Sequence, residues 1–307
     1  MIDMRCLCGN ESDLVVVYEQ NLSEQILSPL NFSARGKHDI DQEHLHYRIV
    51  RCRKCSQLFS NPILPLETIE HFYSKSVHDY SDEIENIAGS YLKPLRKVLP
   101  RLTPGSSILE VGCGSGFILE TLMERGFQQV VGIEPSVQAV AGASPRIRPH
   151  IRNCLFERTS FAESSVDLIC AFQVLDHFVR PDQVIRDFMG ILRPGGMCYA
   201  IIHNEQALHV KVLGEKSPII DVSHIYFFNP RTLRKLFEDA GFQVIDQFNI
   251  WNRYTLRTWL RMLPIPFKSG VLRVLEKAGL ADLSVSIPAG NIGIIAQKRS
   301  GSVEEEG

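Results

Sequence analysis

The sequence predicts an α/β fold: a seven-stranded, mostly parallel sheet with helices on both faces, preceded by a small cysteine-containing module. Three observations support this prediction. Apolar runs alternate with amphipathic segments over residues 105–298, a pattern typical of a sheet that is covered on both faces. A glycine-rich turn at 112–116 directly follows one of the apolar runs. The first 80 residues lack the alternation and contain two pairs of closely spaced cysteines.

Seven apolar runs are expected to form the strands of the sheet. In chain order they are 107–111, 129–133, 149–153, 166–171, 196–203, 242–249 and 290–298. A helix is expected over 181–192, because Pro181 suits its first turn and Pro194-Gly195-Gly196 would end it. Another helix is expected after Asn229, which is a typical N-cap residue and is followed by Pro230.

The composition changes along the chain and predicts its segments. Residues 1–80 are expected to form the cysteine module, and 81–104 a helical connector. The α/β domain is expected over 105–298, and an acidic, disordered tail over 299–307. Within the α/β domain, residues 250–289 separate the last two strands. This insertion is expected to complete the core, to mediate dimerisation or to cap the substrate.

The overall charge and hydropathy exclude several classes of protein. A net charge of −2 and a pI of about 6.6 argue against a nucleic-acid-binding protein. No apolar stretch approaches the ~20 residues of a membrane helix, and the first residues lack the form of a signal peptide. A cytoplasmic protein without a transmembrane segment is therefore expected, with reduced cysteines. No sequence pattern predicts an oligomeric state.

The most specific motif is the glycine-rich turn. Apolar residues 108–111 are typical of a buried strand, and Gly112, Gly114 and Gly116 follow at alternate positions before a helical pattern begins. A strand, a glycine turn and a helix in this order let the backbone approach a nucleotide-like ligand closely.

Two residues beside this turn indicate which ligand it suits. Phe117 stands where the dinucleotide-binding fingerprint has its third glycine. The carboxylate of Glu110 would repel a pyrophosphate, but it suits a ligand that carries an ammonium and a sulfonium. Both residues argue against a nicotinamide-dependent dehydrogenase.

With these residues, the chain resembles the class I S-adenosylmethionine (SAM)-dependent methyltransferases over about residues 85–298. Glu134 ends the second apolar run about 20 residues past the glycines, where that family places an acidic residue on the ribose hydroxyls. The resemblance implies a Rossmann-like methyltransferase sheet with SAM as the cofactor. The expected cofactor-binding residues are Glu110, Gly112, Cys113, Gly114, Gly116, Glu134, Phe172 and Gln173. The run after the third strand lacks an acidic residue, so the adenine amine is expected to depend on backbone groups or Asn153.

The two cysteine pairs, Cys6-x-Cys8 and Cys52-x2-Cys55, offer the four thiols of a tetrahedral zinc site. The region resembles the zinc-binding module that precedes many sugar and natural-product methyltransferases. Its second half matches at Arg51–Cys55 and Phe59–Pro62, and Cys8-Gly9 matches the first half, where Arg5 replaces the usual first cysteine. The expected metal ligands are Cys6, Cys8, Cys52 and Cys55.

Other interpretations of the cysteine pairs stay open at this point. His38, His44 or His46 could replace a missing ligand. A metal-free, degenerate module and a redox dithiol are further alternatives. A zinc ion with four protein ligands would be a zinc-ribbon-like scaffold without an open position for chemistry.

Residues at the ends of strands are the candidates for catalysis, because ligands of open α/β sheets bind beyond the carboxyl ends of the strands. Asp176-His177 matches the family segment after the fourth strand, and His203 ends the fifth. His224 lies in a segment that resembles the acceptor side of the family. The expected catalytic residues are therefore His177, His224 and His203, because a histidine near neutral pH can take a proton from a hydroxyl or an acidic carbon. Each of them could instead be structural, and Asp176 could orient a histidine or stay solvated.

The insertion contains aromatic residues interleaved with basic ones over 251–280. A cap or dimer helix with a solvated basic face is one interpretation. A surface for an anionic acceptor, such as a nucleotide-linked or lipid-linked sugar, is the other, and it would allow peripheral membrane contact.

The expected function is SAM-dependent methyl transfer to a small-molecule or glycan acceptor, with O- or C-methylation. A non-catalytic SAM-binding or scaffold protein with the same fold is the alternative. Neither hypothesis involves nucleic acid as a partner.

Overall fold

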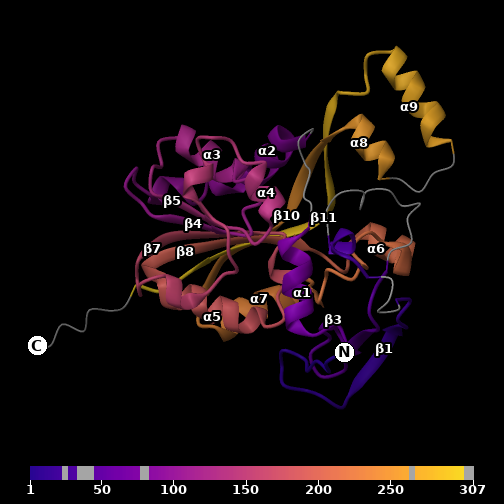
Figure 1. The fold of residues 1–307 in the computed structure, drawn as a ribbon, viewed down its shortest axis with the longest axis horizontal. Helices are drawn as coiled ribbons and strands as arrows, with labels where there is room; N and C mark the ends of the chain where they lie inside the picture. Colours follow the sequence, from indigo (N-terminus) through magenta and orange to yellow (C-terminus); the bar gives the residue numbers. More distant parts are fainter. Residues whose placement is uncertain (23–26, 33–44, 77–82, 263–266, 301–307) are drawn as a thin grey trace, which may run out of the picture.

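The structure is a computed structural model, and it describes residues 1–22, 27–32, 45–76, 83–262 and 267–300. A seven-stranded sheet in the order β10-β11-β8-β7-β4-β5-β6 forms its centre (Figure 1). Its strands are β4 (Ile108–Val111), β5 (Val130–Ile133), β6 (Ile151–Arg152), β7 (Val166–Phe172), β8 (Leu192–His203), β10 (Gln243–Thr255) and β11 (Ser284–Gln297). Only β11 runs antiparallel to its neighbours, β8 and β10, and the other pairs of this sheet are parallel. The predicted fold class is confirmed.

Helices cover both faces of this sheet (Figure 1). On one face lie α2 (Ile84–Leu95), α3 (Phe117–Glu124) and α4 (Val137–Ala141), and on the other α5 (Pro181–Ile191) and α7 (Pro230–Asp239). Helix α5 begins at Pro181 as predicted, and α7 has a capping box between Asn229 and Thr232. The central strands are short apolar runs because both of their faces are buried.

Strand β8 is longer than the sequence predicts. The expected strand starts at 196, but Leu192 already pairs with Val166, so the strand follows α5 without a loop. Gly195, with a φ of +80°, lies inside this strand and hydrogen-bonds to Lys298 at the end of β11. The Pro-Gly-Gly segment therefore belongs to the strand rather than to a turn.

A second sheet has the order β1-β2-β3-β9 and joins three N-terminal strands to a strand that lies between β8 and β10 in sequence. It consists of β1 (Leu14–Tyr18), β2 (Ile49–Cys52), β3 (Leu58–Ser60) and β9 (Tyr226–Phe227). Phe59 of β3 pairs with Tyr226 of β9, which follows β8 in sequence. A single cluster of buried side chains runs from Phe59 to Phe188 and Phe237. The N-terminal residues thus share their core with the α/β domain.

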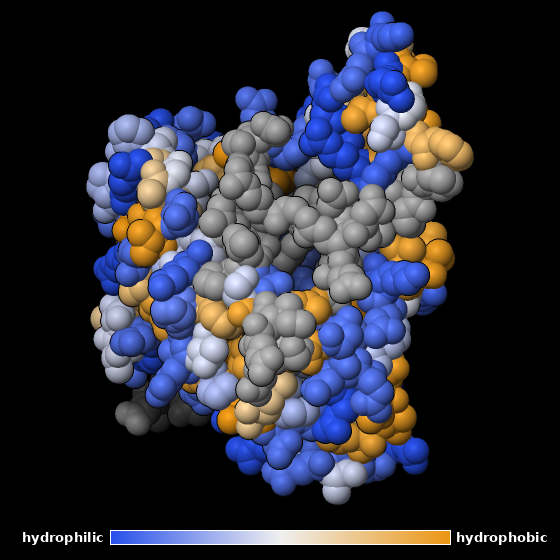
Figure 2. All heavy atoms as spheres, turned by 45° about the vertical axis from the view of Figure 1, so that its right-hand side comes forward, coloured by the Kyte–Doolittle hydropathy of each residue, from blue (hydrophilic) through white to orange (hydrophobic). Residues whose placement is uncertain are grey.

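The insertion continues the sheet before it forms helices. Strands β10 and β11 stay paired as far as Thr255 and Ser284, so only α8 (Leu256–Arg261) and α9 (Lys268–Lys277) form the helical cap, within the broader 250–289 of the sequence prediction. Arg257 pairs with Glu276 and Asp282 inside the insertion. The cap surface mixes hydrophilic side chains with exposed apolar ones (Figure 2).

The remaining elements are short. They are α1 (Leu66–Ser74), α6 (Leu208–Leu213) and the 3-10 helices η1 (Pro29–Phe32), η3 (Leu99–Arg101), η4 (Arg148–His150), η5 (Arg158–Ser160), η6 (Leu175–His177) and η7 (Gly214–Lys216). Among the described residues, no helix is both long and apolar enough to cross a membrane. Residues 301–307 of the predicted tail lie outside the described residues.

Candidate active site

The glycine-rich turn connects β4 to α3 at the carboxyl edge of the sheet. Gly112, Gly114 and Gly116 all have positive φ, between +56° and +76°, a conformation that glycine adopts without strain. A Cβ on Gly112 would lie 2.8 Å from the Val174 side chain, so this glycine permits close packing with the segment after β7. A Cβ on Gly114 would meet no atom of the described residues within 4 Å. Within this part of the chain, the space beside Gly114 is therefore open for a ligand.

Two buried carboxylates lie beside this turn. Glu134 follows β5 and accepts hydrogen bonds from the backbone N–H groups of Gly114 and Ser136, each at 2.8 Å. Glu110 of β4 is 2% exposed, and its Oε2 accepts no hydrogen bond from the described residues. Burial raises the pKa of both carboxyl groups, and the charge of Glu134 raises that of Glu110 further. A cationic ligand would stabilise both carboxylates, as the ammonium of SAM could do.

The segment after β7 forms another wall of this region. Phe172 is buried against the rings of Tyr91 and Tyr199. Gln173 has a φ of +52°, unusual for a side chain of its size, and its amide donates a hydrogen bond to the Tyr91 hydroxyl at 3.2 Å. Burial raises the pKa of Tyr91 to about 12, so its hydroxyl stays protonated. The sequence does not indicate Tyr91, because nothing in α2 distinguishes it from a core aromatic residue.

The side chains of two other residues that were predicted near the cofactor contact the protein itself. The Cys113 side chain points into the core below Gly132, so only its backbone faces the turn. The side-chain amide of Asn153 donates hydrogen bonds to the carbonyls of Glu134 and Pro135, at 2.8 and 3.1 Å. Asn153 thereby holds the loop that follows Glu134.

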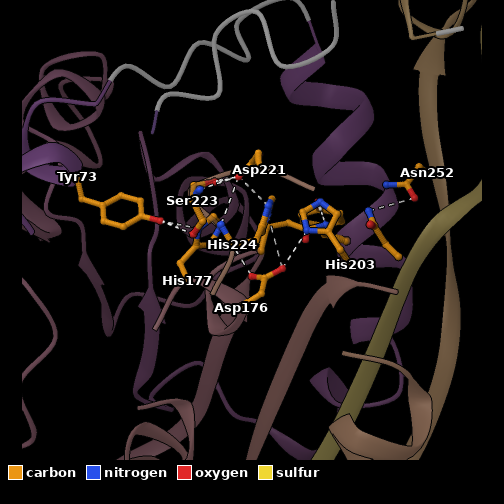
Figure 3. A network of polar contacts seen from close by, with 11 residues as sticks. Tyr73, Asp176, His177, His203, Asp221, Ser223, His224 and Asn252 are labelled. Atoms are coloured by element: carbon orange, nitrogen blue, oxygen red, sulfur yellow. Dashed lines mark hydrogen bonds and ion pairs between the residues drawn. The ribbon is translucent and has the colours of Figure 1, made fainter. Parts of the chain in front are cut away.

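The three predicted histidines meet around one carboxylate, Asp176 of η6 (Figure 3). The Nδ1 atom of His203, at the end of β8, lies 2.9 Å from Asp176 Oδ2. The Nε2 atoms of His177 and His224 lie 3.8 and 3.9 Å from the two oxygens of the same carboxylate. Burial by itself would raise the pKa of Asp176, but the hydrogen bond from His203 and the electrostatic influence of the three neighbouring imidazoles hold it well below its usual range. We call Asp176, His177, His203 and His224 the histidine group.

Tyr73 and Asp221, which the sequence did not indicate, lie close to the Nδ1 atoms of two histidines of the histidine group. The Tyr73 hydroxyl of α1 lies 2.7 Å from His177 Nδ1 and donates a hydrogen bond to the Ser223 carbonyl (Figure 3). Asp221 Oδ1 lies 3.0 Å from His224 Nδ1. Tyr73 is 104 residues away from His177 in sequence, so no local pattern could reveal this contact.

The N-terminal sheet positions His224. The Ser60 hydroxyl donates a hydrogen bond to the His224 carbonyl at 3.0 Å, and the Ser60 N–H donates one to the Ile225 carbonyl at 2.8 Å. Arg51 of β2 binds both carboxylate oxygens of Glu205, two residues past His203, at 3.3 and 3.0 Å. The cysteine module thus contacts His224 itself and Glu205, two residues after His203.

Comparison with known proteins identifies the family of the chain. Residues 84–247, more than half of the sequence, match the family described as "Methyltransferase domain". The chain belongs to this methyltransferase family. The match contains the glycine turn, Glu110, Glu134, His177 and His203, so the predicted resemblance is confirmed for this part.

Individual relatives agree with this family. A "Probable S-adenosylmethionine-dependent methyltransferase" of Mycolicibacterium smegmatis is 28% identical over 149 residues, covering 48% of this chain and 56% of that protein. A ubiquinone biosynthesis O-methyltransferase of Hahella chejuensis is 30% identical over 146 residues, covering 43% of this chain and 60% of that protein. These matches cover between about half and two thirds of the length of each relative, so the chain spans only part of the curated relatives it matches. A solved SAM-dependent methyltransferase of Archaeoglobus fulgidus covers 71% of this chain and 95% of its own at 16% identity, with a TM-score of 0.46.

The four predicted cysteine ligands lie together beside the methyltransferase domain. The Sγ atoms of Cys6 and Cys55 are 3.3 Å apart, those of Cys8 and Cys52 are 3.6 Å apart, and all four lie within 4.8 Å of one another. Sulfurs that bind one tetrahedral zinc at ~2.3 Å are roughly 3.8 Å apart, so this donor set fits zinc. His46 is not needed as a substitute ligand, because its ring bonds to the Tyr47 carbonyl and to Glu215. His38 and His44 lie outside the described residues.

Proposed function

We propose that the chain transfers a methyl group from SAM to a small-molecule or glycan acceptor. The observation that carries the proposal is the contact between the glycine turn and the segment after β7. Val174 packs against Gly112, and Asp176 of the histidine group follows two residues later. A cofactor on the turn and an acceptor at the histidine group would therefore be neighbours at one edge of the sheet.

The glycine turn and its two carboxylates would hold SAM, which supplies an electrophilic methyl group on a sulfonium. Glu110 would bind the ammonium, and Glu134 the ribose hydroxyls, while Gly114 leaves room for the ligand beside its backbone. Phe172 and Gln173 would border the cofactor from the β7 side.

Within the histidine group, His203 is the best placed to take a proton. Its Nδ1 bonds to the buried Asp176, and its side chain is 28% exposed, so Nε2 is left for the acceptor. The arrangement is an aspartate–histidine pair of the kind that orients a general base. The acceptor atom bonds to the methyl carbon as the carbon–sulfur bond breaks and sulfur keeps the electron pair, while His203 takes the acceptor proton.

Oxygen is the acceptor atom that we favour. The relatives named as ubiquinone biosynthesis O-methyltransferases support this choice. We place His177 and His224 on the acceptor side as well, because both rings turn their Nε2 atoms toward Asp176.

We also propose that Cys6, Cys8, Cys52 and Cys55 bind one structural zinc ion. Four sulfurs at the observed separations suit zinc, and such a site has no open position for chemistry. Metal-binding thiols are typical of a reducing compartment, so we propose that the chain acts in the cytoplasm.

Calorimetry with S-adenosylhomocysteine, together with transfer of a labelled methyl group from SAM to an acceptor library, tests the main proposal. His203→Asn should lower kcat by about 100-fold to 10,000-fold, the usual value of a general base, and should keep cofactor affinity. His71→Asn, an exposed histidine of α1, is the control and should change neither quantity. Tight cofactor binding without transfer to any acceptor would favour a non-catalytic SAM-binding protein.

A further inference from the structure

The helical cap, α8 and α9, exposes apolar side chains that the proposed methyl transfer does not use. No residue of these two helices, both of which the structure describes in full, is buried. Figure 1 shows the cap at the far end of the paired strands β10 and β11, away from α5 and α7. Short helices in proteins normally depend on burying an apolar face, so an apolar face that stays exposed indicates a partner.

Helix α9 has such an exposed apolar face. Val271, Val274 and Ala278 follow one another at intervals of three and four residues, so they lie on one side of the helix. All three are exposed, Val274 by 65%, whereas the leucines of α9 are half-buried on an adjacent side. Phe267, the N-cap residue, adds a ring that is 85% exposed at the start of the helix. We call Val271, Val274 and Ala278 the apolar face of α9.

The charge of the insertion differs in sign from that of the whole chain. Residues 250–289 contain six basic and two acidic residues, a net charge of +4 in a chain whose total is −2. Both acidic residues, Glu276 and Asp282, pair with Arg257. Four other basic residues of the insertion are exposed, namely Arg253, Arg261, Arg273 and Lys277. The insertion therefore presents a positively charged surface.

Two of these basic residues flank the apolar face of α9. Arg273 directly precedes Val274, and Lys277 directly precedes Ala278, so each lies about 100° around the helix axis from its neighbour on the apolar face. Hydrophilic and apolar side chains are accordingly mixed on the cap surface (Figure 2). Long basic side chains beside an exposed apolar face are typical of helices that lie in the headgroup region of a bilayer.

We infer that the cap binds the surface of a membrane that contains anionic phospholipids. The apolar face of α9 enters the boundary between headgroups and acyl chains, and Arg273 and Lys277 reach the phosphates. Such a membrane complements both the charge and the apolar face of the cap. A second copy of the chain fits less well, because two caps that met through this surface would bring the same basic residues together. The inference concerns a surface outside the candidate active site, and its test needs no methyl transfer.

Sedimentation of the full chain with vesicles tests the inference. The probe is a vesicle of phosphatidylcholine with about one third phosphatidylglycerol, and a vesicle of phosphatidylcholine alone is the comparison. We expect binding to the anionic vesicle to be at least about 10-fold tighter, and to weaken by at least about 10-fold when the salt concentration rises from about 0.05 M to about 0.5 M. Equal binding to both vesicles, or binding to neither, would overturn the inference.

Charge reversal on α9 tests the contribution of the basic residues. Arg273→Glu with Lys277→Glu should weaken binding to the anionic vesicle by at least about 10-fold. Arg231→Glu with Lys235→Glu is the matched control, because these two residues are exposed on α7 with the same spacing. The control should bind as the unmodified chain does. An equal loss in both variants, or no loss in the α9 variant, would contradict a contact through the cap.

A second pair of variants tests the apolar face. Val271→Ser with Val274→Ser should also weaken binding by at least about 10-fold, because two apolar side chains no longer enter the acyl boundary. Val15→Ser with Val16→Ser in β1 is the control, because these valines are likewise exposed, by 37% and 44%, but lie outside the cap. Unchanged binding by the α9 variant would reduce the contact to adsorption by charge and would overturn insertion of the apolar face.

Tryptophan fluorescence of the unmodified chain covers the case in which a variant does not fold. The chain has two tryptophans, Trp251 and Trp259, and both lie in the insertion. Anionic vesicles with bromine atoms on their acyl chains should therefore quench the fluorescence, and unquenched fluorescence of vesicle-bound protein would overturn the inference. Sedimentation velocity without vesicles tests the other occupant. A dimer that Val271→Ser with Val274→Ser dissociates would assign the apolar face to a second copy and would also overturn the inference.

Discussion

Arg51 and Glu205 form a two-point ion pair that connects the strand of Cys52 to the end of β8. The two nitrogen–oxygen distances are 3.3 and 3.0 Å. The Glu205 side chain is 5% exposed and also accepts a hydrogen bond from Asn229, the cap residue of α7. The pair therefore joins the cysteine module, the end of β8 and the start of α7.

Replacing Arg51 should destabilise the whole chain and not only the cysteine module. Arg51→Met leaves a buried carboxylate with one partner fewer, and we expect the free energy of unfolding to fall by about 1–3 kcal/mol. Arg53→Met is the control, because Arg53 is 67% exposed and lies 3.7 Å from an exposed Asp13. It should cost less than about 1 kcal/mol. Urea unfolding measures both, and equal losses would contradict the structural role of the pair.

Gly114→Val should abolish cofactor binding by filling the open space beside the turn. Gly279→Val is a matched control, because Gly279 also has a positive φ, +69°, and no atom of the residues that the structure describes lies within 4 Å of a Cβ added there. Both substitutions should cost about 1–2 kcal/mol in backbone strain. Calorimetry with S-adenosylhomocysteine should show binding by the Gly279 variant only. Binding by both variants would place the cofactor elsewhere.

The raised pKa of Glu110 predicts how pH changes stability and cofactor affinity. Without a ligand, Glu110 keeps its proton to a higher pH in the folded chain than in the unfolded chain. In the unfolded chain, the pKa of Glu110 is near its ordinary value of 4.5. The folded state therefore binds more protons in this window, and stability falls as pH rises above 4.5 toward the raised pKa. The ammonium of the ligand would favour the carboxylate, so the stabilisation by S-adenosylhomocysteine should grow with pH over the same window.

Glu110→Gln should reduce this pH dependence, and the raised pKa of Glu134 should leave a smaller one of the same sign. The variant should be more stable than the unmodified chain at neutral pH without ligand, because no buried charge has to form. It should bind S-adenosylhomocysteine less tightly by about 1–3 kcal/mol. Thermal unfolding with and without ligand between about pH 5 and 7.5 measures both effects. A pH dependence as large in the variant as in the unmodified chain would assign it to another group.

Cys52→Ser should release the metal of the cysteine module and lower methyl transfer, while cofactor binding remains. The reason is that Ser60, eight residues later, holds the His224 carbonyl. Cys154→Ser is the control, because Cys154 is exposed. Metal analysis of reduced protein without a histidine tag should give about one zinc for the control and less for the variant. An unmodified chain without zinc would show that the cysteines serve another purpose.

Much of the fold follows from local patterns. The glycine turn is predictable because the strand, the turn and the first helical residues are contiguous, and three glycines permit the positive φ values of Gly112 to Gly116. Pro181 and Asn229 mark helix starts for equally local reasons. The sequence did not indicate β9, because two residues carry no periodic pattern and form a strand only against β3.

The amino-acid sequence by itself determined the type of sheet and the glycine turn, and it singled out Glu110, Glu134 and the cysteines and histidines that are the candidates for a site. Spacing along the chain carries this information, since the residues of a turn or a strand end are neighbours in sequence. Only the tertiary structure decided that Asp176 meets three imidazoles and that Tyr73 supports His177. These contacts join four segments of the chain, namely α1, η6, the end of β8 and the loop before β9, and only the tertiary packing brings them together.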